Sequence, residues 1–434
     1  MVEPVIVPRA EHAISRREID PDALKVLYRL KEHGFRAYLV GGSVRDLLLA
    51  RRPKDFDIGT DAHPYQIKKL FRNCWIIGRR FRLAHVKFGP KTIEVATFRR
   101  DVPDVEEPEA PAPNGAAAPA EAAALIPGLR AHHPENTFGT PEQDAFRRDF
   151  TMNALFYDIA TFSVIDYVGG LADLRMRIVR SIGDPDVRFL EDPVRMLRAI
   201  VLATRLDFDL DPPVRDAITR NQALIATASP SRLIEEYYKV LRSGAAERTI
   251  HALGRSGLLR HLTPELDEPP ETLWRSLRAL DAYRSRFGEA PPSLTNAILV
   301  GSMLAPLGLI TRQPHGAGNG GKTPRPVFGI LTVARRDVEH LQQILALQRR
   351  LLDLRAPVRG QRGLTRRHVF GEALAWLEIH GAHPDAVEHW RFVASDAAEM
   401  PPAPGDRQPG EPGPRPRRRR RRRRGPRPMP PEQG

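Results

Sequence analysis

Two aspartates separated by one residue, Asp55 and Asp57, are the side chains of this sequence best suited to chemistry. They lie in the stretch KDFDIGT, which reads as a short strand over residues 54–60. Side chains alternate across a strand, so both carboxylates are expected on one face, with Phe56 and Ile58 on the other. Adjacent carboxylates repel each other unless a cation lies between them, and Mg²⁺ prefers carboxylate oxygens together with substrate phosphates. An edge strand or a turn gives the same spacing, so the pair alone does not establish a metal site.

The residues before this pair favour a phosphate site. Residues 36–40 are expected to form a buried strand, a Gly-Gly-Ser turn ends it, and residues 44–50 begin a helix. This order leaves free backbone N–H groups at the start of the helix, where they suit a phosphate, and the glycines allow close approach. An arginine in the first turn adds a charged fork for phosphate oxygens. The residues expected to hold the phosphates are therefore Gly41, Gly42, Ser43 and Arg45.

A further carboxylate lies in the expected strand over residues 91–98, KTIEVATF. Ile93, Val95 and Thr97 fall on one face of this strand and Glu94 on the other. Glu94 is either the third member of a metal-binding triad or an ordinary exposed strand glutamate, and spacing alone leaves both readings open.

The stretch GGSVRDLLLARRPKDFDI resembles the signature of the nucleotidyltransferase family that contains CCA-adding enzymes and bacterial poly(A) polymerases, within the DNA polymerase beta-like superfamily. The resemblance runs from about Ala37 to the region of Leu262. The family usually has a third glycine where this chain has Ser43, which is small and also a good N-cap. The resemblance implies an α/β nucleotidyltransferase head with a mixed sheet, followed by an all-α body.

The stretch RRDFTMNAL, residues 147–155, resembles a second active-site block of that family. From the residues alone, Asp149 or Thr151 caps the helix that follows. The resemblance implies instead that Asp149 acts catalytically beside the aspartate pair. The residues that it implies for contact with the nucleotide are Arg147, Arg148 and Asn153.

Within residues 183–199, GDPDVRFLEDPVRMLRA, three charged residues recur every three positions: Asp192, Arg195 and Arg198. On one helix they form a polar face, for which a surface ion-pair ladder is the ordinary explanation. The resemblance to the family's E-D-x-x-R block implies that Asp192 and Arg195 hydrogen-bond the Watson–Crick edge of the incoming base. The protein itself then acts as the template, and Arg198 is expected to contact the nucleotide as well.

Together these blocks predict transfer of AMP from ATP to RNA 3′ ends, with two Mg²⁺ ions as cofactors. The metal ligands are expected among Asp55, Asp57 and Glu94, and either Asp149 or Glu94 is the third carboxylate, which completes the coordination or orients the nucleophile. The segment over residues 76–89, IIGRRFRLAHVKFG, resembles the poly(A) polymerase branch, and its arginines Arg79, Arg80 and Arg82 are expected to bind RNA. Two alternatives are a CCA-adding tRNA nucleotidyltransferase and a non-catalytic RNA-binding protein, which would need the carboxylates replaced.

Composition favours a polyanionic partner and a reducing compartment. The 434 residues carry a formal net charge of +14 with 28% charged and 41% hydrophobic residues, which suits a protein that binds RNA. Cys74 is the single cysteine, so the chain is expected to be cytoplasmic. The N-terminus lacks the apolar core of a signal peptide. The longest apolar run, Ala297–Ile310, is shorter than the roughly 20 residues of a membrane span. RNA-decay proteins are candidate partners, because polyadenylation is expected to promote RNA decay.

The predicted domains follow shifts in composition: a flexible arm over 1–20, the head over 21–180 with a mobile insertion at 102–133, a helical neck over 181–265, a helical RNA-binding body over 266–400 and a disordered tail over 401–434. The tail holds eleven arginines against three acids, a net charge of +8. It is expected to bind RNA without sequence preference and in a salt-sensitive manner. The residues named for this role are Arg417, Arg418, Arg419 and Arg420.

Overall fold

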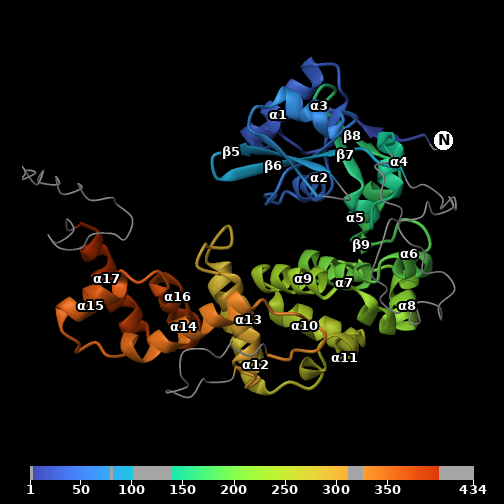
Figure 1. The fold of residues 1–434 in the computed structure, drawn as a ribbon. Coiled ribbons are helices and arrows are strands. Elements are labelled where there is room, and N and C mark those ends of the chain that lie inside the picture. The colour runs from blue at the N-terminus through green and yellow to red at the C-terminus, as the bar shows by residue number, and fades with distance from the viewer. Residues whose placement is uncertain (1–2, 79–81, 101–137, 311–325, 400–434) are drawn as a thin grey trace, which may run out of the picture.

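The computed structural model describes residues 3–78, 82–100, 138–310 and 326–399. Figure 1 shows a head made of a sheet and helices above an elongated body of helices, which confirms the fold class expected from the sequence. The predicted insertion at 102–133, the predicted tail at 401–434 and two of the predicted RNA-binding arginines, Arg79 and Arg80, lie outside the described residues, as do Arg417–Arg420.

The head is built on an eight-stranded sheet of order β1-β8-β7-β2-β3-β6-β5-β4. The strands are β1 (Val5–Val7), β2 (Ala37–Val40), β3 (Asp57–Thr60), β4 (Cys74–Ile77), β5 (Leu83–Phe88), β6 (Lys91–Thr97), β7 (Leu155–Asp158) and β8 (Ser163–Asp166). Strands β3 and β6 pair in parallel, and the other pairs of the sheet are antiparallel. The sheet is therefore mixed, as predicted.

One face of the sheet is covered by helices α1 (Pro21–Glu32) and α3 (Pro64–Leu70). Helix α1 begins where the sequence predicts, because the Asp20 carboxylate accepts the backbone N–H groups of the first turn and Pro21 fits its first position. Ile58 of β3 and Val95 of β6 pack in this layer. Since side chains alternate along a strand, Asp57 and Glu94 project from the opposite face.

The opposite face is covered only in part within the described ranges. A second cluster, which includes Val40, Phe98 and Phe156, fills the side of β2 and β7. Helices α4 (Pro141–Phe146) and α5 (Gly170–Met176) lie close to this half of the sheet. This cluster reaches as far as Gly59 of β3, where a Cβ would lie 2.6 Å from the Phe98 ring. The half formed by β6, β5 and β4 remains open.

The N-terminal segment differs from the flexible arm expected over 1–20. Strand β1 pairs with β8 along the edge of the sheet. Ile14 and Ile19 are buried, and the Ser15 hydroxyl caps a short 3-10 helix at Arg16–Glu18. Backbone pairing and burial of the two isoleucines thus hold the segment against the head, which short local sequence patterns do not reveal.

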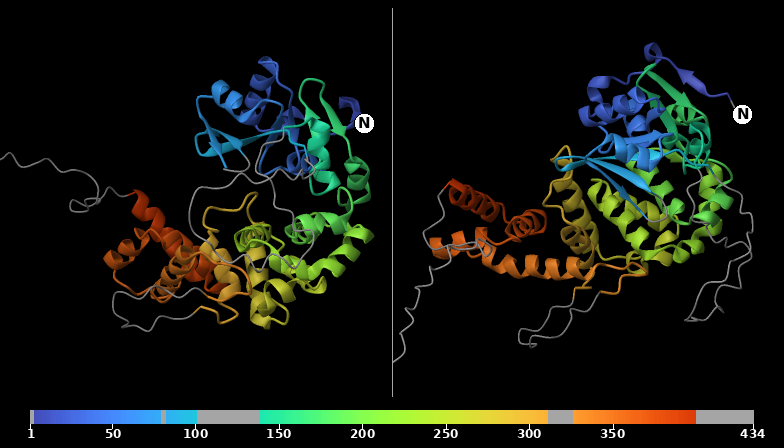
Figure 2. Two further views of the ribbon diagram at one scale, coloured as in Figure 1. Left: turned by 45° about the vertical axis from the view of Figure 1, so that its right-hand side comes forward. Right: turned by 45° about the horizontal axis from the view of Figure 1, so that its top comes forward.

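The body, described over residues 185–310 and 326–399, consists mainly of helices. Its helices are α6 (Pro185–Glu191), α7 (Val194–Leu206), α8 (Pro212–Asn221), α9 (Pro230–Arg242), α10 (Ala246–Arg255), α11 (Leu258–Leu262), α12 (Glu271–Ser285), α13 (Asn296–Leu304), α14 (Arg335–Leu351), α15 (Val358–Thr365), α16 (Phe370–His380) and α17 (Pro384–Glu399). The segment around α5 and a two-stranded pair of β9 (Ile178–Val179) with β10 (Asp209–Leu210) joins the body to the head (Figure 2). In the described residues, none of the helices is both long and apolar enough to cross a membrane.

Candidate active site

Asp57 is the first residue of β3 and lies beside the glycine turn. The register pairs it with Val40, the last residue of β2 and the one before Gly41. Its neighbour Ile58 is fully buried in the helix-covered layer, so the carboxylate points to the open side. The expected strand over 54–60 is too long, because Asp55 precedes β3 instead of lying in it. The Asp55 side chain is 74% exposed, 3.8 Å from Lys54.

The surroundings of Asp57 disfavour its charge. Dense packing around the carboxylate and then the negative charges of Glu94 and Asp55 raise its pKa to about 6, with Arg148 acting in the opposite direction. The residue is nevertheless exposed to solvent. Crowded carboxylates that share one accessible face are the chemistry that a divalent cation relieves, so these residues fit Mg²⁺.

Glu94 lies next to Asp57 on the adjacent strand. The parallel register pairs Ile58 with Val95, which sets the preceding residues, Asp57 and Glu94, side by side on the open face. Glu94 is half exposed and its Oε1 lies 3.5 Å from His85 Nε2. In the described part of the chain, three or more His, Cys, Asp or Glu side chains do not come together as a ready metal cluster. The ligand set and the number of ions therefore remain predictions.

The glycine turn brings backbone and arginine together. Gly41 has a φ of 75°, a value that favours glycine, and a Cβ on it would meet Arg148 Nη1 at 3.0 Å. Helix α2 (Gly42–Leu48) begins two residues earlier than expected. Ser43 is buried in its first turn and donates its Oγ–H to the Val40 carbonyl at 3.0 Å. It is thus not the N-cap, a position that Gly41 takes.

Arg45 differs from the free phosphate fork that the sequence suggests. Its side chain is only 3% exposed, and its guanidinium donates to Asp46 at 2.8 Å and to the Asn153 side chain. It lies against the turn, because a Cβ on Gly42 would sit 3.4 Å from its Nη2. Arg45 and Asn153 therefore support the turn from behind, and a direct contact of either with the nucleotide stays a prediction.

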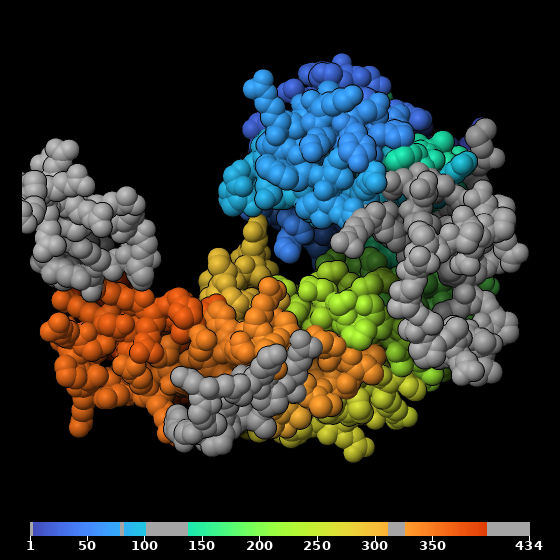
Figure 3. All heavy atoms as spheres, in the orientation of Figure 1, coloured from blue at the N-terminus to red at the C-terminus, as the bar shows by residue number. Residues whose placement is uncertain are grey.

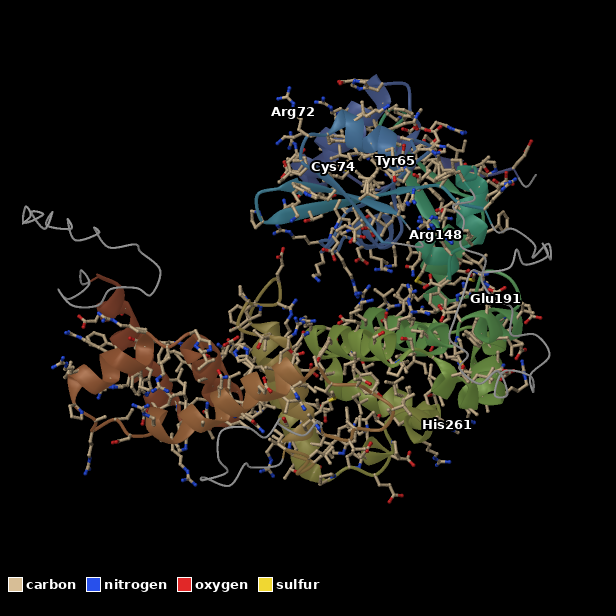
Figure 4. All side chains as sticks on the ribbon, viewed as in Figure 1. Tyr65, Arg72, Cys74, Arg148, Glu191 and His261 are labelled. Atoms are coloured by element: carbon tan, nitrogen blue, oxygen red, sulfur yellow. The ribbon has the colours of Figure 1, made fainter. Side chains whose placement is uncertain are left out.

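Arg148, labelled in Figure 4, lies at the glycine turn, and its positive charge acts on Asp57. Asp144 accepts from its Nη2 at 3.0 Å, the Asn153 carbonyl accepts from its Nη1 at 3.1 Å, and its guanidinium lies 5.4 Å from the centre of the Phe156 ring. These contacts hold the side chain at Gly41. Sequence reasoning missed Asp144, although its spacing of four residues from Arg148 was a usable signal.

Asp149 lies at the junction of head and body, not among the carboxylates of the open face. One carboxylate oxygen accepts the Phe150 backbone N–H at 2.8 Å, and the other lies 2.7 Å from Arg198 of α7. The Asp149 charge raises the pKa of Arg198. Its expected catalytic action beside the aspartate pair stays a prediction, and Glu94 is the carboxylate found next to Asp57.

The three charged residues at i, i+3 and i+6 do not share one helix face, contrary to the expectation. Asp192 lies in the break between α6 and α7, where Arg232 of α9 donates to both of its oxygens at 3.0 and 2.7 Å. The break occurs because Pro193 follows Asp192. Arg195 and Arg198 do lie on α7. Whether Asp192 and Arg195 bind a base stays a prediction.

A further arginine, missed by the sequence reasoning, ties this region to the head. Arg188 of α6 is 8% exposed and donates to the carbonyls of Arg147 at 2.7 Å and Arg148 at 2.8 Å. Glu191, labelled in Figure 4, accepts from Arg188 at 2.9 Å and from Arg195 at 2.8 Å. Arg188 thus fixes the backbone that carries Arg148.

Arg82, the described member of the predicted RNA-binding arginines, lies on the other side of the sheet. It donates to the Tyr65 hydroxyl at 3.2 Å and lies 5.6 Å from the centre of that ring. Tyr65 belongs to α3, which covers the face away from Asp57. A contact of Arg82 with RNA stays a prediction.

Comparisons with known proteins point to one family. Residues 37–180 match the model described as poly A polymerase head domain, and residues 207–268 match a probable RNA and SrmB-binding site of polymerase A. Poly(A) polymerase I of Salmonella typhimurium is 48% identical over 261 residues, which are 60% of this chain and 54% of that protein. The CCA-adding enzyme of Bacillus licheniformis is 37% identical over 262 residues, 60% of each chain. The chain thus spans between a half and two thirds of these relatives.

Solved structures agree on the fold. The Bacillus stearothermophilus CCA-adding enzyme in complex with CTP aligns with a TM-score of 0.58 at 28% identity, covering 87% of this chain and 83% of that one. A tRNA nucleotidyltransferase complexed with a primer tRNA and an incoming ATP analog aligns with a TM-score of 0.51 at 22% identity, which supports the fold alone.

Proposed function

Because this chain belongs to the nucleotidyltransferase family of poly(A) polymerases and CCA-adding enzymes, we propose that it transfers AMP from ATP to the 3′ ends of RNA without a template. The observation that carries the proposal is the carboxylate of Asp57, whose pKa is raised to about 6 beside Glu94 and Asp55. Asp57 pairs with Val40, the residue before the Gly41 turn. Acidic side chains next to a glycine turn and an arginine are what nucleotidyl transfer requires.

In the proposed reaction, the 3′-hydroxyl oxygen of the RNA bonds to the α-phosphorus of ATP. The bond from that phosphorus to the bridging oxygen breaks, pyrophosphate leaves, and the hydroxyl proton passes to solvent or a nearby carboxylate. Asp55, Asp57 and Glu94 would hold Mg²⁺, which when bound activates the hydroxyl and neutralises charge on the phosphates. At neutral pH the Asp57 carboxylate is mostly ionised, as this role requires.

The remaining residues position the nucleotide. The Gly41 turn lets phosphate oxygens approach the backbone, and Arg148 supplies a positive charge already oriented by Asp144. Arg188 holds the backbone of Arg148 through its carbonyl. A triphosphate in this place would meet donors that need little rearrangement, which is the main source of catalysis in such reactions.

For the base, Asp192 and Arg195 are the proposed reading groups, and both already have partners in the free protein. Arg232 holds Asp192 through two hydrogen bonds, and Glu191 holds Arg195. A base that bonds Asp192 therefore competes with Arg232 or shares the carboxylate with it. The protein would then favour the nucleotide whose base best compensates for the weakened Asp192–Arg232 ion pair.

Two observations support ATP as the sole nucleotide. The segment over residues 76–89 resembles the poly(A) polymerase branch, and relatives named Poly(A) polymerase I reach 46–48% identity against 37% for the CCA-adding enzyme of Bacillus licheniformis. The second candidate function is CCA addition to tRNA, favoured by the fold match to a CCA-adding enzyme in complex with CTP. The third, a non-catalytic RNA-binding protein, is disfavoured because the carboxylates are present.

The deciding experiment offers the purified protein each nucleotide separately. With ATP, a generic single-stranded RNA is expected to grow by a ladder of adenosines, while CTP, GTP and UTP give no product. Incorporation of CTP onto a tRNA that lacks its CCA end would replace the first function by the second. Failure of every nucleotide on every RNA, together with retained RNA binding, would leave the non-catalytic function.

A further inference from the structure

A row of side chains crosses the open face of the sheet and starts at the candidate active site. Glu94 of β6 is the neighbour of Asp57 and pairs with His85 of β5. His85 in turn pairs with Trp75 of β4, the edge strand. Neighbouring strands lie about 4.8 Å apart, so three steps place Trp75 about 14 Å from Asp57 along the sheet. The two are connected by one continuous surface.

Trp75 is an unusually exposed aromatic side chain. It is 51% exposed, and Ile77 on the same face is 48% exposed. The chain has four tryptophans, of which Trp376 and Trp390 are buried. Trp274 is half-buried and stacks on His251, with the ring centres 3.8 Å apart. Fold stability does not account for such exposure, because an indole contributes to stability by being buried.

Trp75 also carries a positive charge beside it. The Lys87 ammonium on the neighbouring strand lies 5.1 Å from the centre of the indole ring, a cation–π distance. An exposed aromatic ring next to a lysine is the combination with which proteins bind single-stranded nucleic acid: the ring stacks on a base and the cation pairs with a phosphate.

This surface lies on the side of the head that faces the body. Cys74, the residue before Trp75, is buried on the side of α3, as its position in Figure 4 shows, so Trp75 must point to the other side. In Figure 1 the helices α1 and α3 lie above β5 and β6, and the body lies below them. Figure 3 shows the molecule hollowed between this side of the head and the body. An RNA strand in the hollow would lie against the open face.

We propose that Trp75 and Lys87 bind the single-stranded RNA just upstream of its reacting 3′ end, with one base stacked on the indole and a phosphate at the lysine. The proposal rests on the proposed function and assigns the RNA its path across the sheet. Continuity with Asp57 and Glu94 supports RNA as the occupant, since a strand whose 3′-hydroxyl reaches the carboxylates has to leave them along this face or the hollow. Stacking tolerates any base, which suits an enzyme that extends many RNAs.

The steady-state test compares Trp75→Ala and Trp75→Phe with a matched control, Phe392→Ala, which removes another exposed aromatic side chain, on α17. Loss of one stacked base is expected to raise the KM for a long oligoadenylate about tenfold. The KM for ATP, the kcat and the KM for a dinucleotide primer too short to reach the indole stay unchanged. Trp75→Phe restores most of the affinity and Phe392→Ala changes nothing.

A binding test separates this proposal from the proposed function, because it needs no turnover. In the Asp57→Asn background, oligoadenylate is expected to quench the fluorescence of the exposed Trp75, and the quench is lost in Trp75→Phe while the protein still unfolds cooperatively. An unchanged KM for long RNA in Trp75→Ala, or a quench that persists in Trp75→Phe, would overturn the proposal and leave the surface to a protein partner.

Discussion

Replacement of Asp57 by asparagine is expected to stabilise the head and to abolish turnover at the same time. In the wild type the carboxylate has its pKa raised from 3.8 to about 6, so at neutral pH the folded state carries a charge that its surroundings disfavour. Asparagine keeps the shape of the side chain and removes the charge. The structural reason for the gain in stability is therefore the same crowding of carboxylates that suits the site to a cation.

The size and the pH range of the gain follow from the shift. Two pKa units correspond to about 3 kcal/mol, and because the side chain contacts solvent, we expect about 1–2 kcal/mol. The folded pKa is higher than the unfolded one, so the folded state binds more protons between them and wild-type stability falls as pH rises. The advantage of Asp57→Asn is then full above about pH 6, shrinks below it and vanishes below about pH 4.

The assay is urea unfolding of both proteins in EDTA, followed by far-UV circular dichroism. Added Mg²⁺ is expected to narrow the difference by stabilising the wild type. A variant that is less stable than the wild type at neutral pH, or a difference that does not change with pH, would refute the crowding of charges. Retained nucleotide addition would refute the metal assignment.

Two further predictions concern the turn and the tail. Gly41→Ala is expected to cost about 1–3 kcal/mol of stability and to raise the KM for ATP. The Gly41 φ of 75° disfavours a side chain, and a Cβ would lie 3.0 Å from Arg148 Nη1. Gly34 also has a positive φ but open space around it, so Gly34→Ala is the control that should lose stability without a change in the KM for ATP. An unchanged KM for ATP would argue against the turn as the triphosphate site. Deletion of residues 401–434 is expected to weaken RNA binding while the KM for a dinucleotide primer stays the same. The slope of log K for RNA binding against log salt concentration should fall in magnitude by about 0.7 per lost phosphate contact. An unaltered slope would exclude the tail as an RNA-binding segment.

The sequence by itself determined the local units of this protein. Alternation of apolar and polar residues in β3 and β6, the cap at Asp20 and the glycine turn at Gly41 each depend on residues within a few positions of one another. Such patterns gave the faces of Asp57 and Glu94 correctly. The succession of a mixed sheet and a helical body was expected from the resemblance to a known family, since alternation within single strands does not fix how the strands pair.

Only the tertiary structure decided which partners the charged residues take. Arg45 meets an asparagine 108 positions away, and Asp192 is held by Arg232, 40 positions away. The bond from Arg188 to the Arg147 carbonyl likewise joins the body to the head. Local spacing predicted a free phosphate fork and a single helix face at these sites. An ion pair or a buried hydrogen bond depends on which elements pack together, and packing is set by the whole chain and not by the neighbours in sequence.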